Sequence, residues 1–159
     1  MKGERQMEMG RYVEQWGVLL EVMGGSRAMG KILGWLLICE PPEQTARQIA
    51  EGGGMSIASI STATRALMQA GMIERVRARG ERSALFRIRP GMWADLLKKR
   101  MSHTGTMRDL AERGQAFLSS NDRESALRLK EIHSYCSFIE REMPALVERW
   151  EERWKKERG

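Results

Sequence analysis

Cysteine and histidine are scarce in this sequence of 159 residues. The chain has two cysteines, Cys39 and Cys136, and two histidines, His103 and His133. Because these four residues lie far apart in sequence, we expect no metal site, and no cofactor is predicted. No nucleophile, base and orienting group can be assembled convincingly either, which argues against an enzyme.

Long apolar runs are also missing. No stretch approaches the ~20 apolar residues that a membrane span needs, and the charged N-terminus Met1–Arg5 lacks the apolar core of a signal peptide. We therefore expect a cytoplasmic protein with reduced thiols and without a membrane partner. A redox switch at Cys136 is the alternative to a buried, inert thiol, and the inert thiol is favoured.

Acidic residues are fewer than basic ones, and the difference is local. The chain holds 27 Lys and Arg against 21 Asp and Glu, a net charge of +6. Residues 25–91 alone hold ten basic and five acidic side chains, whereas the flanking segments are nearly balanced. Such an excess favours a polyanionic partner, nucleic acid before a membrane surface.

Helical periodicity dominates the first part of the chain. Apolar residues recur at spacings of three and four over residues 5–23, and residues 27–39 are apolar nearly all round. Ser26 is the expected cap of this second helix. Thr45 and Gln48 form a capping box for a short third helix.

The third helix should end at the glycines 52–54, and Ser56 should begin a fourth helix that stops at Gly71. The period then changes once. Residues 72–77 alternate between apolar and polar, and residues 83–89 resume strand character after a turn, which predicts a two-stranded hairpin as the only substantial sheet.

The remainder, residues 92–159, is predicted to be helical with an interruption at residues 119–121. Asn121 and Glu124 should cap the final helix, and Pro144 should kink or split it. The fold class is therefore mainly α. It is a winged helix-turn-helix domain at residues 25–91 with a two-stranded β wing, an N-terminal dimerisation helix at residues 1–24 and a C-terminal helical dimerisation region at residues 92–159.

The helix-turn-helix pattern places short hydroxyls where DNA would lie. Ala50 is small at the expected helix crossing, and Ile60 and Ala63 should face back onto the preceding helix. Polar side chains then occupy the exposed side of residues 56–70, where a major groove would be met. Together with the caps and the wing, the predicted DNA-binding residues are Thr45, Ser56, Ser59, Ser61, Thr62, Arg65, Arg77, Arg79 and Arg82.

The hairpin is rich in arginine, a side chain that suits phosphates and the negative potential of a minor groove. Its six arginines are Arg75, Arg77, Arg79, Arg82, Arg87 and Arg89, against Glu74 and Glu81. A solvated surface ribbon is the alternative interpretation, and it is favoured for Arg75 and Arg89 near the strand ends.

Several motifs resemble the GbsR-like branch of the MarR-type regulators, from about residue 12 to residue 90. They are Trp16-Gly17, Gly30–Gly34, Pro41-Pro42, Thr45-Ala46, Ile49–Glu51, Ser59–Arg65 and Gly71–Val76, with looser similarity at Pro144–Leu146 and Glu148–Trp150. The resemblance implies a homodimer built from the terminal helices, a recognition helix at residues 56–70 and a wing at residues 72–89. The sequence departs from the family pattern at Gly53, Ile57 and Ala58.

The pattern and the resemblance together predict a transcriptional regulator that binds double-stranded DNA, a ligand-responsive repressor acting as a homodimer. The resemblance allows a small-molecule effector, and Met29 and Trp35 are candidates for the lining of its pocket, with a filled core as the alternative. A helical interaction module on a winged-helix scaffold, without DNA binding, is the rival function.

Two further patterns receive weaker interpretations. Gly25–Lys31 nearly spells a phosphate-binding loop, but Ile32 stands where a hydroxyl should meet the metal ion, so nucleotide binding is not favoured. The tail from Trp150 to Trp154 could lie on a membrane surface. Because glutamates offset its basic residues, a dimer seam or a core-covering face is the preferred interpretation.

Overall fold

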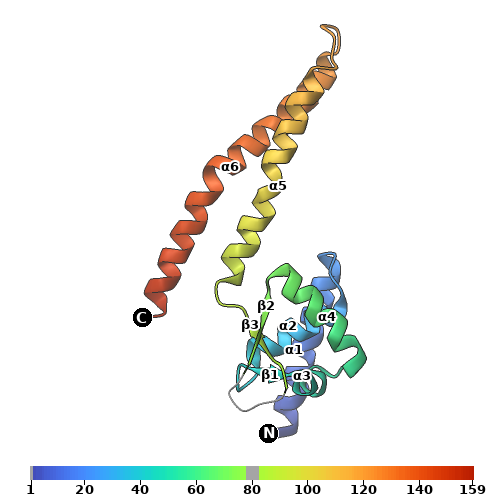
Figure 1. Cartoon of the computed structure of the whole chain (residues 1–159), viewed down its shortest axis with the longest axis vertical. Helices are drawn as coiled ribbons and strands as arrows, with labels where there is room; N and C mark the ends of the chain where they lie inside the picture. Colours follow the sequence, from blue (N-terminus) through green and yellow to red (C-terminus); the bar gives the residue numbers. More distant parts are fainter. Residues whose placement is uncertain (1, 78–82) are drawn as a thin grey trace. The chain divides into compact units, whose positions relative to one another are not determined.

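Two separate units make up the structure, a computed structural model that describes residues 2–77 and 83–159. They are Met1–Met92 and Trp93–Gly159. The first unit holds the elements α1 (Lys2–Val22), α2 (Arg27–Ile38), β1 (Gln44–Thr45), α3 (Ala46–Gly53), α4 (Ile57–Ala70), β2 (Ile73–Val76) and β3 (Leu85–Ile88) (Figure 1). The second unit holds α6 (Arg123–Glu157) and α5 (Met92–Gln115), except for the first residue of α5.

The predicted boundaries of α2, α3 and α4 are confirmed at their capping residues, whereas α1 begins three residues before its expected start at residue 5. The Ser26 hydroxyl accepts a hydrogen bond from the Met29 N–H at 3.2 Å, and Thr45 and Gln48 form the reciprocal capping box at the start of α3. Helices α3 and α4 end at Gly54 and Gly71, whose φ angles of 59° and 77° lie in the left-handed region. Glycine adopts this region without a steric penalty, so both helices stop where the sequence predicts.

Close packing of α1 on α2 forms the first layer of the core. A methyl group added at Gly30 would lie 2.2 Å from the Trp16 carbonyl oxygen, and one added at Gly34 would lie 2.8 Å from the Trp16 Cβ. The two helices can therefore approach this closely only because glycine stands at both positions. The core residues around this crossing and beneath α3 and α4 are Val13, Leu20, Ile32, Leu33, Ile49, Ile60 and Leu67.

The two-stranded wing is confirmed as β2 and β3, but the sheet has a third strand that was not expected, in the order β1-β3-β2. The short strand β1 adds to β3 through the antiparallel pairs Gln44↔Phe86 and Thr45↔Leu85. Gln44 is buried, and its side chain donates to the Pro41 carbonyl at 2.7 Å and accepts from the Trp35 indole at 3.3 Å. These contacts fix β1 at the sheet edge next to the start of α3.

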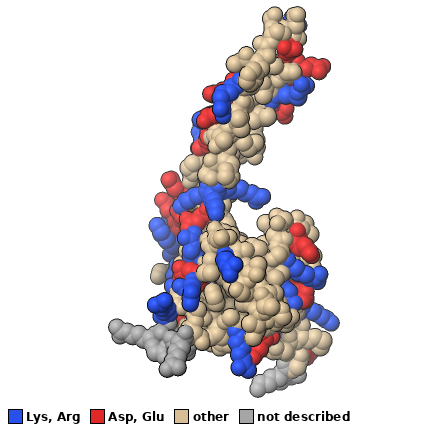
Figure 2. Space-filling view, turned by 45° about the vertical axis from the view of Figure 1, so that its right-hand side comes forward, with Lys and Arg blue, Asp and Glu red and all other residues tan. Residues whose placement is uncertain are grey.

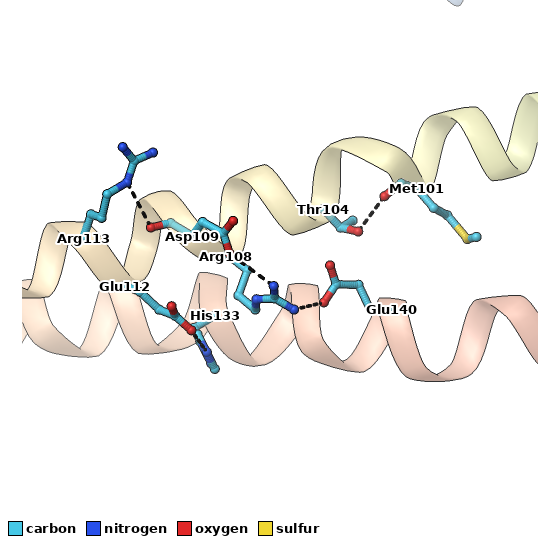
Figure 3. A network of polar contacts seen from close by, with 8 residues as sticks. All are labelled: Met101, Thr104, Arg108, Asp109, Glu112, Arg113, His133 and Glu140. Atoms are coloured by element: carbon cyan, nitrogen blue, oxygen red, sulfur yellow. Dashed lines mark hydrogen bonds and ion pairs between the residues drawn. The ribbon is translucent and has the colours of Figure 1, made fainter.

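In the second unit, α5 and α6 run antiparallel and are joined by ion pairs. Arg108 on α5 binds Glu140 on α6, and the Glu112 carboxylate lies 2.9 Å from the His133 ring (Figure 3). Several effects raise the pKa of Arg108, and the largest of them is its hydrogen bond to the carboxylate of the neighbouring Asp109. Figure 2 shows basic and acidic side chains interspersed along this helical pair, as expected for solvated helix faces.

One expectation for the final helix was wrong. Its N-cap position is Asp122 rather than Asn121, and the Asp122 side chain makes no cap hydrogen bond. The Asp122 carboxylate instead accepts from the backbone N–H and the hydroxyl of Ser119, both at 2.8 Å, and so closes the preceding turn. Of the two outcomes expected at Pro144, the split does not occur, because the helix continues unbroken through this residue; its ribbon bends (Figure 1), as a kink allows. A proline removes one backbone hydrogen bond, and the remaining helical bonds on both sides keep the element continuous.

Candidate nucleic-acid interface

Helix α4 presents two distinct faces. Ile60, Ala63, Thr64 and Leu67 are buried against the rest of the first unit. An adjoining face carries a row of exposed residues at a spacing of four, Ile57, Ser61 and Arg65. This spacing aligns side chains along one side of a helix, so the three residues form a continuous stripe.

This stripe borders an open cleft of about 780 Å³, which we call the α4–wing cleft. The start of α3, one side of α4 and the strands β2 and β3 form its walls. Its lining residues are Thr45, Ala46, Arg47, Ile57, Ile60, Ser61, Thr64, Arg65, Met68, Arg75, Ser83, Ala84 and Phe86. The cleft therefore brings together segments that are up to about forty residues apart in sequence.

The predicted helix residues differ in how free their side chains are. Ser61, Thr62 and Arg65 are exposed. Ser59 is half-buried, and its hydroxyl donates to the Ser56 carbonyl at 2.8 Å. The Ser56 hydroxyl donates to Ser59 Oγ at 3.3 Å and makes no cap hydrogen bond, so both serines are engaged within the first turn.

Thr45 is also engaged, because its hydroxyl accepts from the Gln48 N–H at 3.2 Å and donates to Gln48 Oε1 at 3.0 Å. Thr45 therefore caps α3 and also borders the α4–wing cleft. Of the predicted wing arginines, Arg77 is exposed. Arg79 and Arg82 lie outside the described residues.

The wing arginines divide by the face of the sheet on which they lie. Arg87 pairs with Glu74 at 2.7 Å and with Glu43 at 3.1 Å. The hydrogen bond that the guanidinium donates to Glu74 is the largest of the effects that raise the pKa of Arg87. Arg89 donates to the Gly71 carbonyl at 2.8 Å, at the turn after α4. Both side chains thus help to hold the wing to its own unit.

Arg75 lies on the opposite face from Arg87, because neighbouring residues of a strand alternate. It stands across from Phe86 in the β2–β3 ladder, and both line the α4–wing cleft. Within residues 2–77 and 83–159, neither Arg75 nor Arg65 has a carboxylate partner. The cleft therefore holds two guanidinium groups whose charge is not neutralised by the described part of the protein.

Sequence reasoning missed Arg75 as a cleft residue and interpreted it as solvated. Its pairing with Phe86 depends on the register of the hairpin, which the sequence does not reveal. Arg47, which also lines the cleft, was missed as well; it pairs with Glu51 one helical turn away at 2.9 Å. Its place in the first turn of α3, two residues after the Thr45 cap, is the signal that could have identified it.

A separate cluster of charges ties the turn between α3 and α4 to the first two helices. Lys31 Nζ donates to Glu14 Oε1 at 2.5 Å and to the Gly54 carbonyl at 3.3 Å. Arg27 pairs with the same carboxylate at 3.1 Å. The hydrogen bond from Lys31 is the largest of the effects that hold the pKa of Glu14 below its ordinary value. This cluster anchors the turn that precedes α4.

The two residues predicted to line an effector pocket have structural contacts of their own. A methyl group at Gly52 would lie 2.2 Å from the Trp35 ring, so the indole packs directly on this glycine, and its N–H donates to Gln44. Met29 is half-buried in the first turn of α2. These contacts fit a filled core, and a ligand at Met29 and Trp35 stays a prediction.

The second unit contains an apolar cavity of about 370 Å³ between its two helices. Its walls are Trp93, Ala94, Leu97, Leu146, Val147 and Trp150. Aliphatic and aromatic side chains make up this described lining, so a ligand here would be held by apolar contact rather than by charge.

The cysteines are buried. The pKa of the Cys39 thiol is raised, chiefly because the thiol is buried, and Cys39 therefore stays protonated at neutral pH. Cys136, on α6, is completely buried. No group of three metal-ligating side chains occurs in the part of the chain that the structure describes, and none of its helices is long and apolar enough to cross a membrane.

Comparisons with known proteins point to one class of protein. Residues 91–153 match a family model described as MmpR5-like MarR family transcriptional regulator. The HTH-type transcriptional regulator MmpR5 of Mycobacterium tuberculosis is 32% identical over 142 residues, which cover 89% of this chain and 86% of that protein. A crystal structure described as a transcriptional regulator superposes with a TM-score of 0.74 at 31% identity, over 91% of this chain and 99% of that one.

Proposed function

The chain belongs to the MarR family of transcriptional regulators, and from this premise we propose that it binds double-stranded DNA sequence-specifically through the α4–wing cleft. The observation that carries the proposal is the pair Arg65 and Arg75, which border one cleft without a carboxylate partner among the described residues. Guanidinium groups bind phosphate oxygens well, and the DNA backbone supplies these in a regular row.

The division of roles follows from the elements that hold the two arginines. Arg65 shares the exposed stripe of α4 with Ser61, and a recognition helix presents such side chains to base edges in the major groove. Arg75 extends from the wing, where contacts to the phosphate backbone orient the protein without reading sequence. Thr62 and the wing residues Arg77, Arg79 and Arg82 belong to the same proposed surface.

An operator selection from random duplex DNA, followed by fluorescence anisotropy, tests this assignment. Arg65→Ala should weaken binding to the selected duplex by about 1–3 kcal/mol and weaken binding to a scrambled duplex less. Equal losses on both duplexes would show that Arg65 reads no base. If the wild-type protein binds neither duplex at low salt, the DNA-binding proposal fails and a protein-interaction module becomes the better account.

We further propose that the protein acts as a homodimer built from its terminal helices. The second unit leaves many large apolar side chains exposed, a surface that a single solvated helical pair would not retain. They are Trp93, Met107, Leu110, Phe117, Leu127, Ile132, Tyr135, Phe138, Leu146, Trp150 and Trp154. On α1 the residues Val18, Leu19 and Val22 are exposed as well.

A twofold dimer would bury these faces and would place two copies of α4 on one duplex. Light scattering should give twice the monomer mass of 18.2 kDa. A monomer mass at micromolar concentration would refute the dimer, whatever the outcome of the DNA-binding experiment.

A repressor role with a small-molecule effector, and membership in the GbsR-like branch, are the finer parts of the proposal. The support for an effector is the apolar cavity of the second unit between Trp93 and Trp150. A lining by Met29 and Trp35 stays a prediction. A screen of small metabolites and aromatic acids by thermal shift and DNA release is the test. An effector should raise the melting temperature of the protein and lower its affinity for the operator. A screen that finds no such compound would favour the alternative of a filled core without a ligand pocket.

A further inference from the structure

One exposed side chain on the stripe of α4 has no explanation in the fold. Ile57 is the first residue of α4, and 62% of its surface is exposed. The helix begins at the Ser56 cap, and the core contact of this turn is made by Ile60. A branched aliphatic residue gains nothing from water at such a position, because its burial is what stabilises it.

The surroundings of Ile57 combine basic, hydroxyl and apolar side chains. It precedes Ser61 and Arg65 on the same stripe, and together with Arg47 it lines both the α4–wing cleft and a second hollow of about 390 Å³. Ile57 thus forms an exposed apolar ridge between two hollows. A protein partner would be expected to meet a broader apolar patch, such as those on the second unit.

The charges around this ridge select duplex DNA as the occupant. Arg65 and Arg75 have no carboxylate partner in the described parts of the chain, and they border the hollow that Ile57 also lines. The first residues of a recognition helix are those that reach the base edges. In the major groove, the C5 methyl group of thymine is the one apolar group that the base edges offer.

We propose that Ile57 contacts the C5 methyl group of a thymine in the major groove and so specifies an A·T pair at that position of each half-site. This inference rests on the proposed function, because it requires that α4 enters the groove. It adds a specificity-determining residue that carries no hydrogen-bonding group. The sequence pattern offered only serines, threonines and Arg65 for base recognition.

Replacing thymine by deoxyuridine tests the contact, because this change removes the methyl group and leaves every hydrogen-bonding group of the base in place. Each thymine of the selected operator is replaced in turn, and binding is measured by fluorescence anisotropy. For the wild-type protein, each half-site should contain one thymine whose replacement weakens binding about fourfold, the effect of losing one buried methyl group. Ile57→Ala should bind the thymine and deoxyuridine duplexes equally at that position.

Two variants serve as controls. Arg65→Ala should lower the affinity for both duplexes by the same factor and so keep the ratio between them. Ile57→Val, which retains a branched aliphatic side chain, should keep part of the discrimination. Because Ile57 is exposed, both substitutions at this position should leave the melting temperature within about 1–2 °C of the wild type.

The outcomes separate this inference from the proposed function. If the wild-type protein binds no duplex, the proposed function fails, and this inference fails with it. If the protein binds its operator but no deoxyuridine replacement matters, or if the discrimination persists in Ile57→Ala, the thymine contact is overturned and the DNA-binding proposal stands. A change of oligomeric mass in Ile57→Ala would assign Ile57 to a protein contact and would also overturn the inference.

Discussion

Replacing Gly30 by alanine should separate α1 from α2. The added methyl group would lie 2.2 Å from the Trp16 carbonyl oxygen and 2.7 Å from the Gly17 Cα, and both are backbone atoms. Neither can rotate away, so α1 as a whole must shift by about 1 Å to restore ordinary contact distances. Such a shift loosens the packing of Val13 and Leu20 against α2.

The magnitude follows from two opposing effects. Overpacking of a tight core costs about 1–3 kcal/mol, and the upper end applies here because both contacts are to backbone. The higher helix propensity of alanine returns about 1 kcal/mol. The free energy of unfolding should therefore fall by about 2 kcal/mol, which lowers the melting temperature by roughly 4–8 °C in a chain of this length.

Circular dichroism with heating, at one fixed protein concentration, measures this change. Gly10→Ala is the matched control, because Gly10 also lies within α1 and has no atom within 4 Å of the added methyl group. This control should be as stable as the wild type or more stable. A Gly30→Ala protein with the melting temperature of the wild type would refute the close crossing of α1 and α2.

Two further predictions concern single contacts in the first unit. Glu14→Gln should lower the free energy of unfolding by about 0.5–1 kcal/mol at neutral pH, a small effect because the carboxylate is partly exposed. Since its folded pKa is lowered, chiefly by Lys31, this stabilisation is present above the ordinary value of 4.5 and is lost as the pH falls through the folded pKa. Urea titrations that show the same difference between the two proteins in acid as at neutral pH would contradict this. Thr45→Ala should cost about 1 kcal/mol by removing the capping box, whereas Thr45→Ser should stay close to the wild type in the same titration.

Local signals in the sequence predicted most of the first unit. Caps and stops act within a few residues, so Ser26, Thr45 and Gly71 could be identified without knowledge of the rest of the fold. The change of period at residues 72–89 likewise predicted the wing. The short strand β1 was missed because its two residues gain their strand character only by pairing with β3, about forty residues further along.

The candidate site was predictable only in part, for the same reason. The helical spacing showed that Ser61 and Arg65 share a face, because that relation is fixed within α4. Which face of the wing each arginine occupies depends on the strand register, so Arg75 and Arg87 could not be told apart in advance. The close approach at Gly30 depends on the crossing of two helices, and no local pattern specifies that geometry.

The salt dependence of DNA binding for two matched arginine variants tests the central claim most directly. Arg75→Ala and Arg87→Ala each remove one positive charge from the wing, but only Arg75 borders the α4–wing cleft, while Arg87 is paired with Glu43 and Glu74. Binding of the folded proteins to one duplex is measured over a range of salt concentrations. The account predicts that Arg75→Ala makes the plot of log K against log salt shallower by about one unit for each phosphate that the protein no longer neutralises, and hence by about two in a dimer. Arg87→Ala should keep the slope of the wild type. Equal slopes for the wild type and Arg75→Ala, or a shallower slope for Arg87→Ala alone, would contradict the assignment of this cleft to DNA.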